Sequence, residues 1–217
     1  MTVADTAFST RENICALMKR LRGMNDSDYL LYMITYHAAP TLLGKKPATL
    51  VCPDGNGRNL GQALDNCVPC LARTFGVKIA SFRNGAGALL YLIYRPELLG
   101  ETLAQRDAAE LLAEAGYDSP KGDVDALLEI LRHRCSGPRF PHEIGVFLGY
   151  PVDDVRRFMT DGGKGCRASG CWKTYADPEH VRRCSELYRL MRLRAAELIV
   201  RGADLRDLAV ELRSFAA

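Results

Sequence analysis

Side chains that can do chemistry are concentrated in residues 140–175. His142 and Glu143 are neighbours at a predicted helix start, where they can serve as an acid and base pair or as metal ligands. Cys166 and Cys171 lie in a glycine-rich loop that gives the backbone freedom to turn both thiols toward one metal ion. These four residues are the first candidates for a catalytic or metal site.

The His142 and Glu143 pair also has a purely structural interpretation. Pro141 can occupy the first helical turn, Glu143 favours the positive end of the helix, and His142 can satisfy a neighbouring loop. The zinc-protease pattern His-Glu-x-x-His is absent. A small enzyme would instead use His142 or His37 as the acid or base, and Cys171 as the nucleophile or redox thiol.

A second cysteine pair, Cys67 and Cys70, has the spacing of half a zinc or iron-sulfur site or of a redox pair. Together with Cys166 and Cys171 it would supply four thiolates, if the two segments meet in space. In a helical stretch, however, cysteine is often a small buried hydrophobe. If the protein binds zinc or iron, we therefore expect the metal at Cys166 and Cys171. The alternative is that these two thiols bind no metal.

Another group of residues combines positive charge with hydrogen-bond donors. Its members are His37, Thr41, Lys45 and Lys46 after a predicted helix, Arg83 and Arg95 at the ends of a predicted hairpin, and Lys173. If these side chains converge, they form a pocket for phosphate or carboxylate. No phosphate-binding glycine loop, dinucleotide fingerprint or nucleophile elbow accompanies them, so the sequence specifies neither a nucleotide nor an acyl-transfer triad.

The composition excludes several classes of protein. The 217 residues are 47% hydrophobic and 25% charged, as in a soluble globular protein. The net charge of +3, from 29 basic and 26 acidic residues, is too small to indicate a nucleic-acid-binding surface. The first residues lack the pattern of a secretion signal, and the apolar run over 29–43 is too short for a membrane span. We expect a cytoplasmic protein, in which the eight cysteines are thiols, metal ligands or redox groups rather than disulfides.

Hydrophobic spacing and turn residues predict an α+β fold. The expected sheet is small, with about three strands, and contains a hairpin across the turn at 84–87; the C-terminal half is helical. We predict one domain over 1–217, with a possible subdivision near residue 137. The predicted strands are 48–52, 77–83 and 88–95, and the predicted helices are 9–22, 28–39, 60–75, 97–99, 103–115, 124–134, 142–148, 152–159, 178–201 and 205–215.

Residues 143–158 have the spacing of a helix-turn-helix, with Gly145 at a close helix contact and Gly149 in the turn. We expect the apolar side chains of this pair to be buried, namely Ile144, Phe147, Leu148, Val155 and Phe158. The second helix begins with Asp153 and Asp154, which DNA phosphates would repel. A packed helical pair is therefore favoured over nucleic-acid binding.

Four segments carry a family resemblance: residues 37–48, the strand end Tyr94-Arg95, the block at 140–155, and Gly-Cys-Trp-Lys-Thr-Tyr at 170–175. Over about residues 27–200 the chain resembles the bacterial family known as domain of unknown function 3793. The resemblance implies an iron- or redox-related setting, because members occur beside flavodoxin and iron-uptake genes. The functional hypothesis is an accessory protein that binds an anionic small molecule or cofactor.

The predicted helix over 178–201 carries five arginines, at positions 182, 183, 189, 192 and 194. Its apolar stripe is expected to include Cys184, Leu187, Tyr188 and Met191. Most arginine runs of this kind are solvated faces. The alternative is a docking surface for an acidic redox protein such as a flavodoxin.

Overall fold

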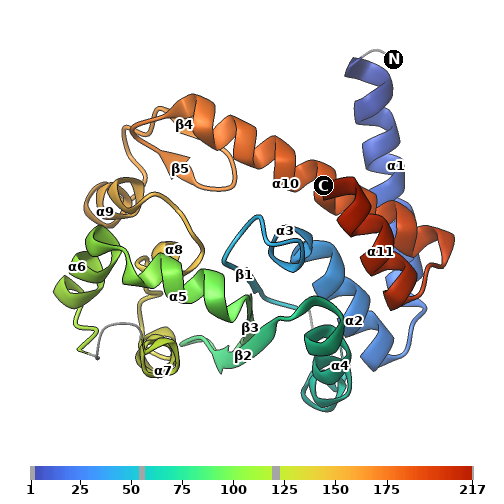
Figure 1. Cartoon of the computed structure of the whole chain (residues 1–217), viewed down its shortest axis with the longest axis horizontal. Coiled ribbons are helices and arrows are strands. Elements are labelled where there is room, and N and C mark those ends of the chain that lie inside the picture. The colour runs from blue at the N-terminus through green and yellow to red at the C-terminus, as the bar shows by residue number, and fades with distance from the viewer. Residues whose placement is uncertain (1–2, 54–56, 119–122, 217) are drawn as a thin grey trace.

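The computed structural model describes residues 3–53, 57–118 and 123–216, and it has the predicted α+β architecture (Figure 1). The strands are β1 (Ala48–Val51), β2 (Lys78–Arg83), β3 (Leu89–Tyr94), β4 (Ala168–Ser169) and β5 (Lys173–Thr174). The helices are α1 (Val3–Arg22), α2 (Asp26–His37), α3 (Ala39–Leu42), α4 (Leu60–Phe75), α5 (Pro96–Ala104), α6 (Arg106–Glu114), α7 (Val124–Cys135), α8 (Ile144–Phe147), α9 (Val152–Asp161), α10 (Pro178–Arg201) and α11 (Leu205–Ala216).

The element boundaries follow local signals where these are strong. The side chain of Asn25 caps α2 by accepting from the Asp28 backbone N–H, and Asp177 caps α10 in the same way one residue before Pro178. Several predicted bounds need correction. Helix α1 begins at Val3 rather than at residue 9, the helix predicted over 97–99 extends to Ala104, the next helix begins at Arg106 rather than at residue 103, and α8 is a single turn that starts after Glu143. The single-turn helix α3 and the short β4–β5 hairpin are absent from the predicted elements.

Strand β3 is the centre of a three-stranded antiparallel sheet with the order β1-β3-β2. Its two neighbours pair with it in full register, with Ala48 and Lys78 both opposite Tyr94. Because successive side chains of a strand point to opposite faces, β3 supplies two separate sets of core residues. Leu90 and Leu92 face one way, and Tyr91 and Ile93 face the other.

Each face of the sheet is covered by its own helical layer. The first core joins α1, α2, α4, α10 and α11 to Tyr91 and Ile93, while the second joins α5 through α9 to Leu90 and Leu92. In Figure 1 the second layer occupies the left side, and α10 runs from the β4–β5 hairpin across the top back to α1. The C-terminal helices therefore belong to the same core as the N-terminal ones. Within the described ranges, no helix is long and apolar enough to cross a membrane.

The N-terminal half of α10 differs from its predicted apolar stripe. Leu187 is 41% exposed, whereas Met191, Leu198 and Ile199 are buried. The buried part of the helix lies against α1, and its first turns instead contact the β4–β5 hairpin. Polar groups can therefore line the early part of this helix.

The predicted helical pair α8–α9 packs into the second core. Ile144, Phe147, Leu148 and Val155 are buried, as expected, but Phe158 is only half-buried because it borders a cavity. The expected close contact at Gly145 is confirmed: a methyl group there would lie 2.8 Å from a Val155 methyl carbon.

Gly149 brings two distant segments together. It occupies the turn between α8 and α9 with φ of +73°, and a Cβ at this position would lie 2.6 Å from the Pro47 ring. Pro47 immediately precedes β1. The contact therefore places Lys46, before Pro47, near Tyr150, after Gly149.

Replacing Gly149 with alanine is expected to destabilise the protein for two reasons, a strained positive φ and a clash with Pro47. Gly162→Ala is a matched control, since Gly162 also has positive φ but has no neighbour within 4 Å of a built Cβ. We expect the control to cost about 1 kcal/mol in unfolding free energy, and Gly149→Ala to cost about 1–3 kcal/mol more. Urea unfolding measures both. Equal losses would contradict the close approach to Pro47.

Candidate functional site

A basic cavity of about 530 Å³ lies where the two helical layers meet beside β1. Its wall combines the end of α2, the loop before β1, the α8–α9 turn, the β4–β5 turn and the first half of α10. We call it the basic cavity because its charged lining residues are all cations. The lining residues are His37, Pro40, Lys46, Thr49, Leu50, Tyr150, Gly170, Cys171, Ser185, Tyr188, Arg189 and Arg192.

Lys46 is the most unusual residue of the basic cavity. Lys46 is only 8% exposed, and its ammonium lies 5.2 Å from the centre of the Tyr150 ring and 5.9 Å from the centre of the Tyr188 ring. No ion pair or hydrogen bond from the described residues compensates this charge. Burial lowers the pKa of Lys46 from 10.5 to about 8; nearby Cys171 opposes the shift, and Arg192 adds to it.

The other ionisable groups leave the cavity positively charged. Arg189 is neutralised by Glu186, to which it donates at 2.7 and 2.8 Å, whereas Arg192 has no ion pair with a described residue. Burial and Arg192 lower the pKa of His37, so that its imidazole is neutral at pH 7. Lys46 and Arg192 are thus two cations facing a polar space, and no carboxylate is among the described residues of its wall.

Cys171 adds a thiol to the same cavity. The Ser185 hydroxyl donates to the Cys171 sulfur at 3.3 Å and accepts from the Cys171 backbone N–H at 2.9 Å. The tight turn at Gly170 permits this contact, since a Cβ there would lie 2.2 Å from the Ser185 oxygen. The β4–β5 turn is therefore fixed to α10, with Cys171 on the cavity wall.

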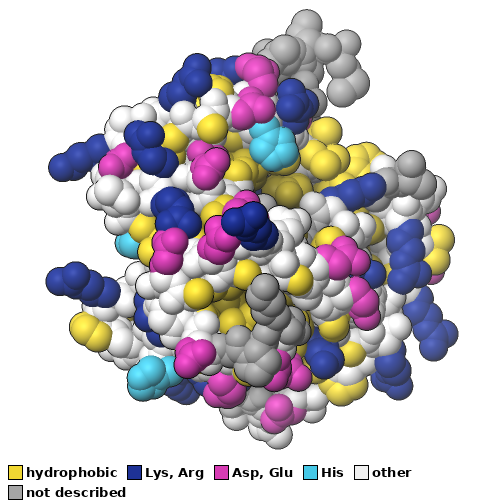
Figure 2. All heavy atoms as spheres, turned by 60° about the vertical axis from the view of Figure 1, so that its left-hand side comes forward, with side chains coloured by type: hydrophobic (Ala, Val, Ile, Leu, Met, Phe, Trp, Pro, Cys, Tyr) yellow, Lys and Arg dark blue, Asp and Glu magenta, His cyan; other side chains and the backbone are white. Residues whose placement is uncertain are grey.

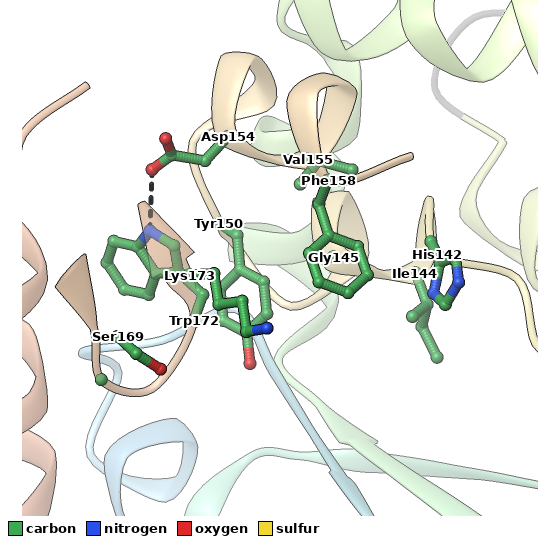
Figure 3. A pocket seen from close by; sticks show the side chains of 11 residues that line it. His142, Ile144, Gly145, Tyr150, Asp154, Val155, Phe158, Ser169, Trp172 and Lys173 are labelled. Atoms are coloured by element: carbon green, nitrogen blue, oxygen red, sulfur yellow. Dashed lines mark hydrogen bonds between the residues drawn. The ribbon is translucent and has the colours of Figure 1, made fainter. Parts of the chain in front are cut away.

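A second, more apolar cavity of about 300 Å³ adjoins the first. Tyr150 and Gly170 line both, so the two spaces share one wall. Figure 3 shows the aromatic rings that border the second cavity. Trp172 stacks on Tyr150 with ring centres 5.2 Å apart, and His142 meets Phe158 edge-on at 5.0 Å. We call this space the aromatic cavity.

A buried carboxylate holds the wall between the cavities in place. Asp154 is 3% exposed and accepts from the Trp172 indole N–H at 2.8 Å (Figure 3). It also accepts from the Tyr175 backbone N–H at 2.7 Å. These two bonds join α9 to the β4–β5 hairpin. They fix the ring of Trp172, which in turn supports Tyr150.

The predicted site residues are divided between the two cavities and other places. His37 and Cys171 come together in the basic cavity, although they are more than 130 positions apart. His142 and Lys173 lie around the aromatic cavity, with the Lys173 ammonium 5.9 Å from the Phe158 ring centre. His142 and Cys171 thus line different cavities, whereas His37 and Cys171 line the same one.

Four predicted ligand residues make contacts elsewhere. The hydroxyl of Thr41 bonds to that of Thr49 at 2.8 Å, and the Arg95 guanidinium donates to the carbonyls of Leu42 and Phe75. Arg83 lies at the hairpin end and donates to the Gly87 carbonyl. The side chain of Lys45 is exposed, while its carbonyl accepts from the Tyr188 hydroxyl. Lys46, rather than its neighbour Lys45, faces the cavity.

Glu143 is engaged inside the second core. It is 2% exposed, and it accepts from the Arg134 guanidinium at 2.5 Å and from the Tyr117 hydroxyl at 3.3 Å. Burial and the charge of Glu143 raise the pKa of Tyr117. Glu143 therefore ties α8 to α7, whereas the His142 ring contacts Phe158.

The cysteines show no metal-binding group in the part of the chain that the structure describes. No set of three or more His, Cys, Asp or Glu side chains there could hold a metal ion. Cys67 is buried in α4, donates to the Leu64 carbonyl and has a pKa raised to about 11 by burial. Cys166 and Cys171 are both partly exposed free thiols. Zinc or iron at Cys166 and Cys171 stays a prediction.

The sequence did not identify several residues of the cavity wall. Arg192 was expected on a solvated face, and Tyr150, Ser185 and the hydroxyl of Tyr188 were not among the candidate ligand residues. The spacing of Ser185, Tyr188 and Arg192 nevertheless indicates a shared face. Positions 185, 188, 189 and 192 follow the i, i+3, i+4, i+7 spacing of one helix face. Such a polar stripe on an otherwise amphipathic helix predicts that this face lines a solvent-accessible cavity. Nothing in the sequence placed Tyr150 beside it.

The remaining arginines of α10 are largely neutralised. Arg182 pairs with Glu179, and Arg194 pairs with both Glu197 and Glu211. On the face shown in Figure 2, basic and acidic side chains alternate rather than forming one positive field. An acidic docking partner therefore stays a prediction, as does the expectation that nucleic acid does not bind.

Lys46→Met is expected to stabilise the protein at pH 7. The lowered pKa means that the charged form costs about 3 kcal/mol in the folded state. Between pH 8 and 10.5 the unfolded chain binds more protons at this site than the folded one, so wild-type stability rises with pH there. The advantage of Lys46→Met in urea unfolding at low ionic strength should therefore shrink over this window.

Lys45→Met is the control, because the neighbouring side chain is exposed and should change stability by less than about 0.5 kcal/mol. A Lys46→Met protein less stable than wild type at pH 7 would show that the lysine charge is compensated in the folded state.

Comparison with protein families gives a match over residues 34–209 to the family described as "Protein of unknown function (DUF3793)", which confirms the family resemblance. The matched range contains every residue that lines the two cavities. No curated protein and no solved structure matches the chain.

Proposed function

We propose that this chain, which belongs to the DUF3793 family, binds a small anionic molecule through a phosphate or carboxylate group in its basic cavity. The observation that carries the proposal is the buried ammonium of Lys46, which lines an open space without a counter-charge. A buried charge is costly unless it is paired. A bound anion supplies the missing partner.

The geometry around Lys46 suits an anion in two further respects. Arg192 provides planar donors that match the oxygens of a carboxylate or phosphate, and it faces Lys46 closely enough to shift its pKa. The cavity volume falls within the range of small-molecule sites.

Inorganic phosphate and acetate are suitable first probes. We expect either anion to raise the melting temperature relative to chloride at equal ionic strength, because a ligand that binds only the folded state stabilises it. Binding should also change the emission of Trp172, the sole tryptophan, which stacks on Tyr150 at the cavity wall.

Arg192→Gln should weaken anion binding by about tenfold or more, since a charge-assisted hydrogen bond contributes about 1.5–3 kcal/mol. Arg183→Gln is the matched control, because Arg183 lies on the same helix but is exposed and lines neither cavity. Isothermal titration of phosphate into the three proteins makes the comparison. Equal affinities, or no binding to wild type, would refute the proposal.

A second candidate function is supported by the meeting of His37 and Cys171 in one cavity. A neutral imidazole and a thiol there are the components of His and Cys chemistry, as the enzyme hypothesis requires. The two cations would attract anionic reagents to Cys171.

We therefore expect iodoacetate to alkylate Cys171 faster, relative to neutral iodoacetamide, than it alkylates the exposed Cys15. Phosphate should suppress this preference by occupying the cavity. Peptide mass mapping gives both ratios. The same reagent ratio at Cys15 and Cys171 would argue against a thiol served by the basic cavity.

The wider setting rests on the family resemblance and on the amino-acid sequence, and not on the basic cavity. We propose that the protein is cytoplasmic and has an accessory role in an iron- or redox-related setting. An acidic redox protein such as a flavodoxin is the proposed partner. The eight cysteines agree with a reducing compartment, because the described ones are all free thiols.

A further inference from the structure

We infer that Lys46 forms a reversible imine with the carbonyl group of the anionic ligand, so that the ligand belongs to the small oxo acids or phosphorylated carbonyl compounds. The inference rests on the proposed function, because the ligand's anionic group must first bind in the basic cavity. It adds a covalent role for one side chain and a chemical class for the ligand.

The first support is the position of Lys46. The lysine is nine-tenths buried, its ammonium contacts the rings of Tyr150 and Tyr188, and it still lines the open cavity. Two aromatic walls limit the water around the amine. Lysines that react with carbonyl groups are activated in two ways, by desolvation in an apolar pocket or by a neighbouring cation. Lys46 has both, since Arg192 supplies the cation.

The second support is the state of the amine. Only the neutral amine attacks a carbonyl carbon, and the pKa of about 8 leaves roughly a tenth of Lys46 neutral at pH 7. The charged and titratable groups around it come from every wall: His37 from α2, Tyr150 from the α8–α9 turn, Cys171 from the β4–β5 turn, and Tyr188, Arg189 and Arg192 from α10. Burial raises the pKa of Tyr150 to about 12, so this phenol stays neutral.

The reaction needs no further reagent. The Lys46 nitrogen attacks the carbonyl carbon, and a C–N bond forms as the C=O π electrons move to oxygen. The oxygen then leaves with both amine protons as one water molecule, which gives C=N. The neutral imidazole of His37 lines the same cavity and can carry a proton between nitrogen and oxygen. Arg192 remains free to hold the anionic group.

Glyoxylate and pyruvate combine a carbonyl with a carboxylate, and they are the probes. Cyanoborohydride reduces an imine to a stable amine, so peptide mass mapping locates the adduct. At pH 7 we expect Lys46 to be labelled at least about tenfold faster than exposed Lys45, because burial lowers the pKa of the Lys46 amine and the cavity holds the carboxylate of the probe. Acetaldehyde lacks the carboxylate and should show a smaller preference for Lys46.

The variants separate chemistry from folding. Lys46→Arg keeps the positive charge but cannot form an imine, so it should lose the adduct while phosphate still raises its melting temperature. Arg192→Gln should lower labelling by glyoxylate more than labelling by acetaldehyde, because it removes the partner of the carboxylate as well as the cation that activates the amine. Lys45→Arg should leave the labelling of Lys46 unchanged.

The outcomes distinguish this inference from the proposed function. If phosphate stabilises the protein but neither oxo acid labels Lys46 in preference to Lys45, the imine is refuted and anion binding stands. If acetaldehyde labels Lys46 as selectively as glyoxylate, the anionic carbonyl class is refuted. If no anion stabilises the wild-type protein, both the proposed function and the inference fail.

Discussion

The central strand β3 is the constraint on which the rest of the structure depends. It is buried on both faces, so each helical layer must pack against alternate side chains of the same six residues. The layers meet beside β1, where Thr49 and Leu50 reach the basic cavity. The site therefore lies at a junction between two cores, which is a common location for small-molecule sites.

A chain of close contacts gives this junction a defined shape. Gly149 rests against Pro47, Asp154 holds Trp172, and Gly170 lies against Ser185. Each contact joins different structural elements, and together they bring Lys46 and Tyr150 to the wall of one cavity. The buried ammonium is an energetic cost that packing alone does not explain. Stability and function are expected to oppose each other at this residue.

Arg192 and Lys46 have different roles in ligand binding under the two proposals. Arg192 recognises the anionic group, and Lys46 neutralises it or reacts with a neighbouring carbonyl. The aromatic cavity shares Tyr150 and Gly170 with the basic one, so a ligand held by its anionic end has apolar space beside it. A ligand in either cavity would change the environment of the Trp172 ring, which stacks on Tyr150.

The sequence by itself determined the family, the α+β class and the bounds of elements with strong local signals, such as α4 over Leu60–Phe75 and α10 after its Asp177 cap. These depend on periodicity and capping, which are local. It also placed His37 and the Lys45-Lys46 pair in one loop region, but it could not decide which lysine faces inward. That choice, and the position of His37, Cys171 and Arg192 in the wall of one cavity, depend on how α10 packs across β1 and the α8–α9 turn. Only the tertiary structure decides them, because the contacts join residues far apart in the chain.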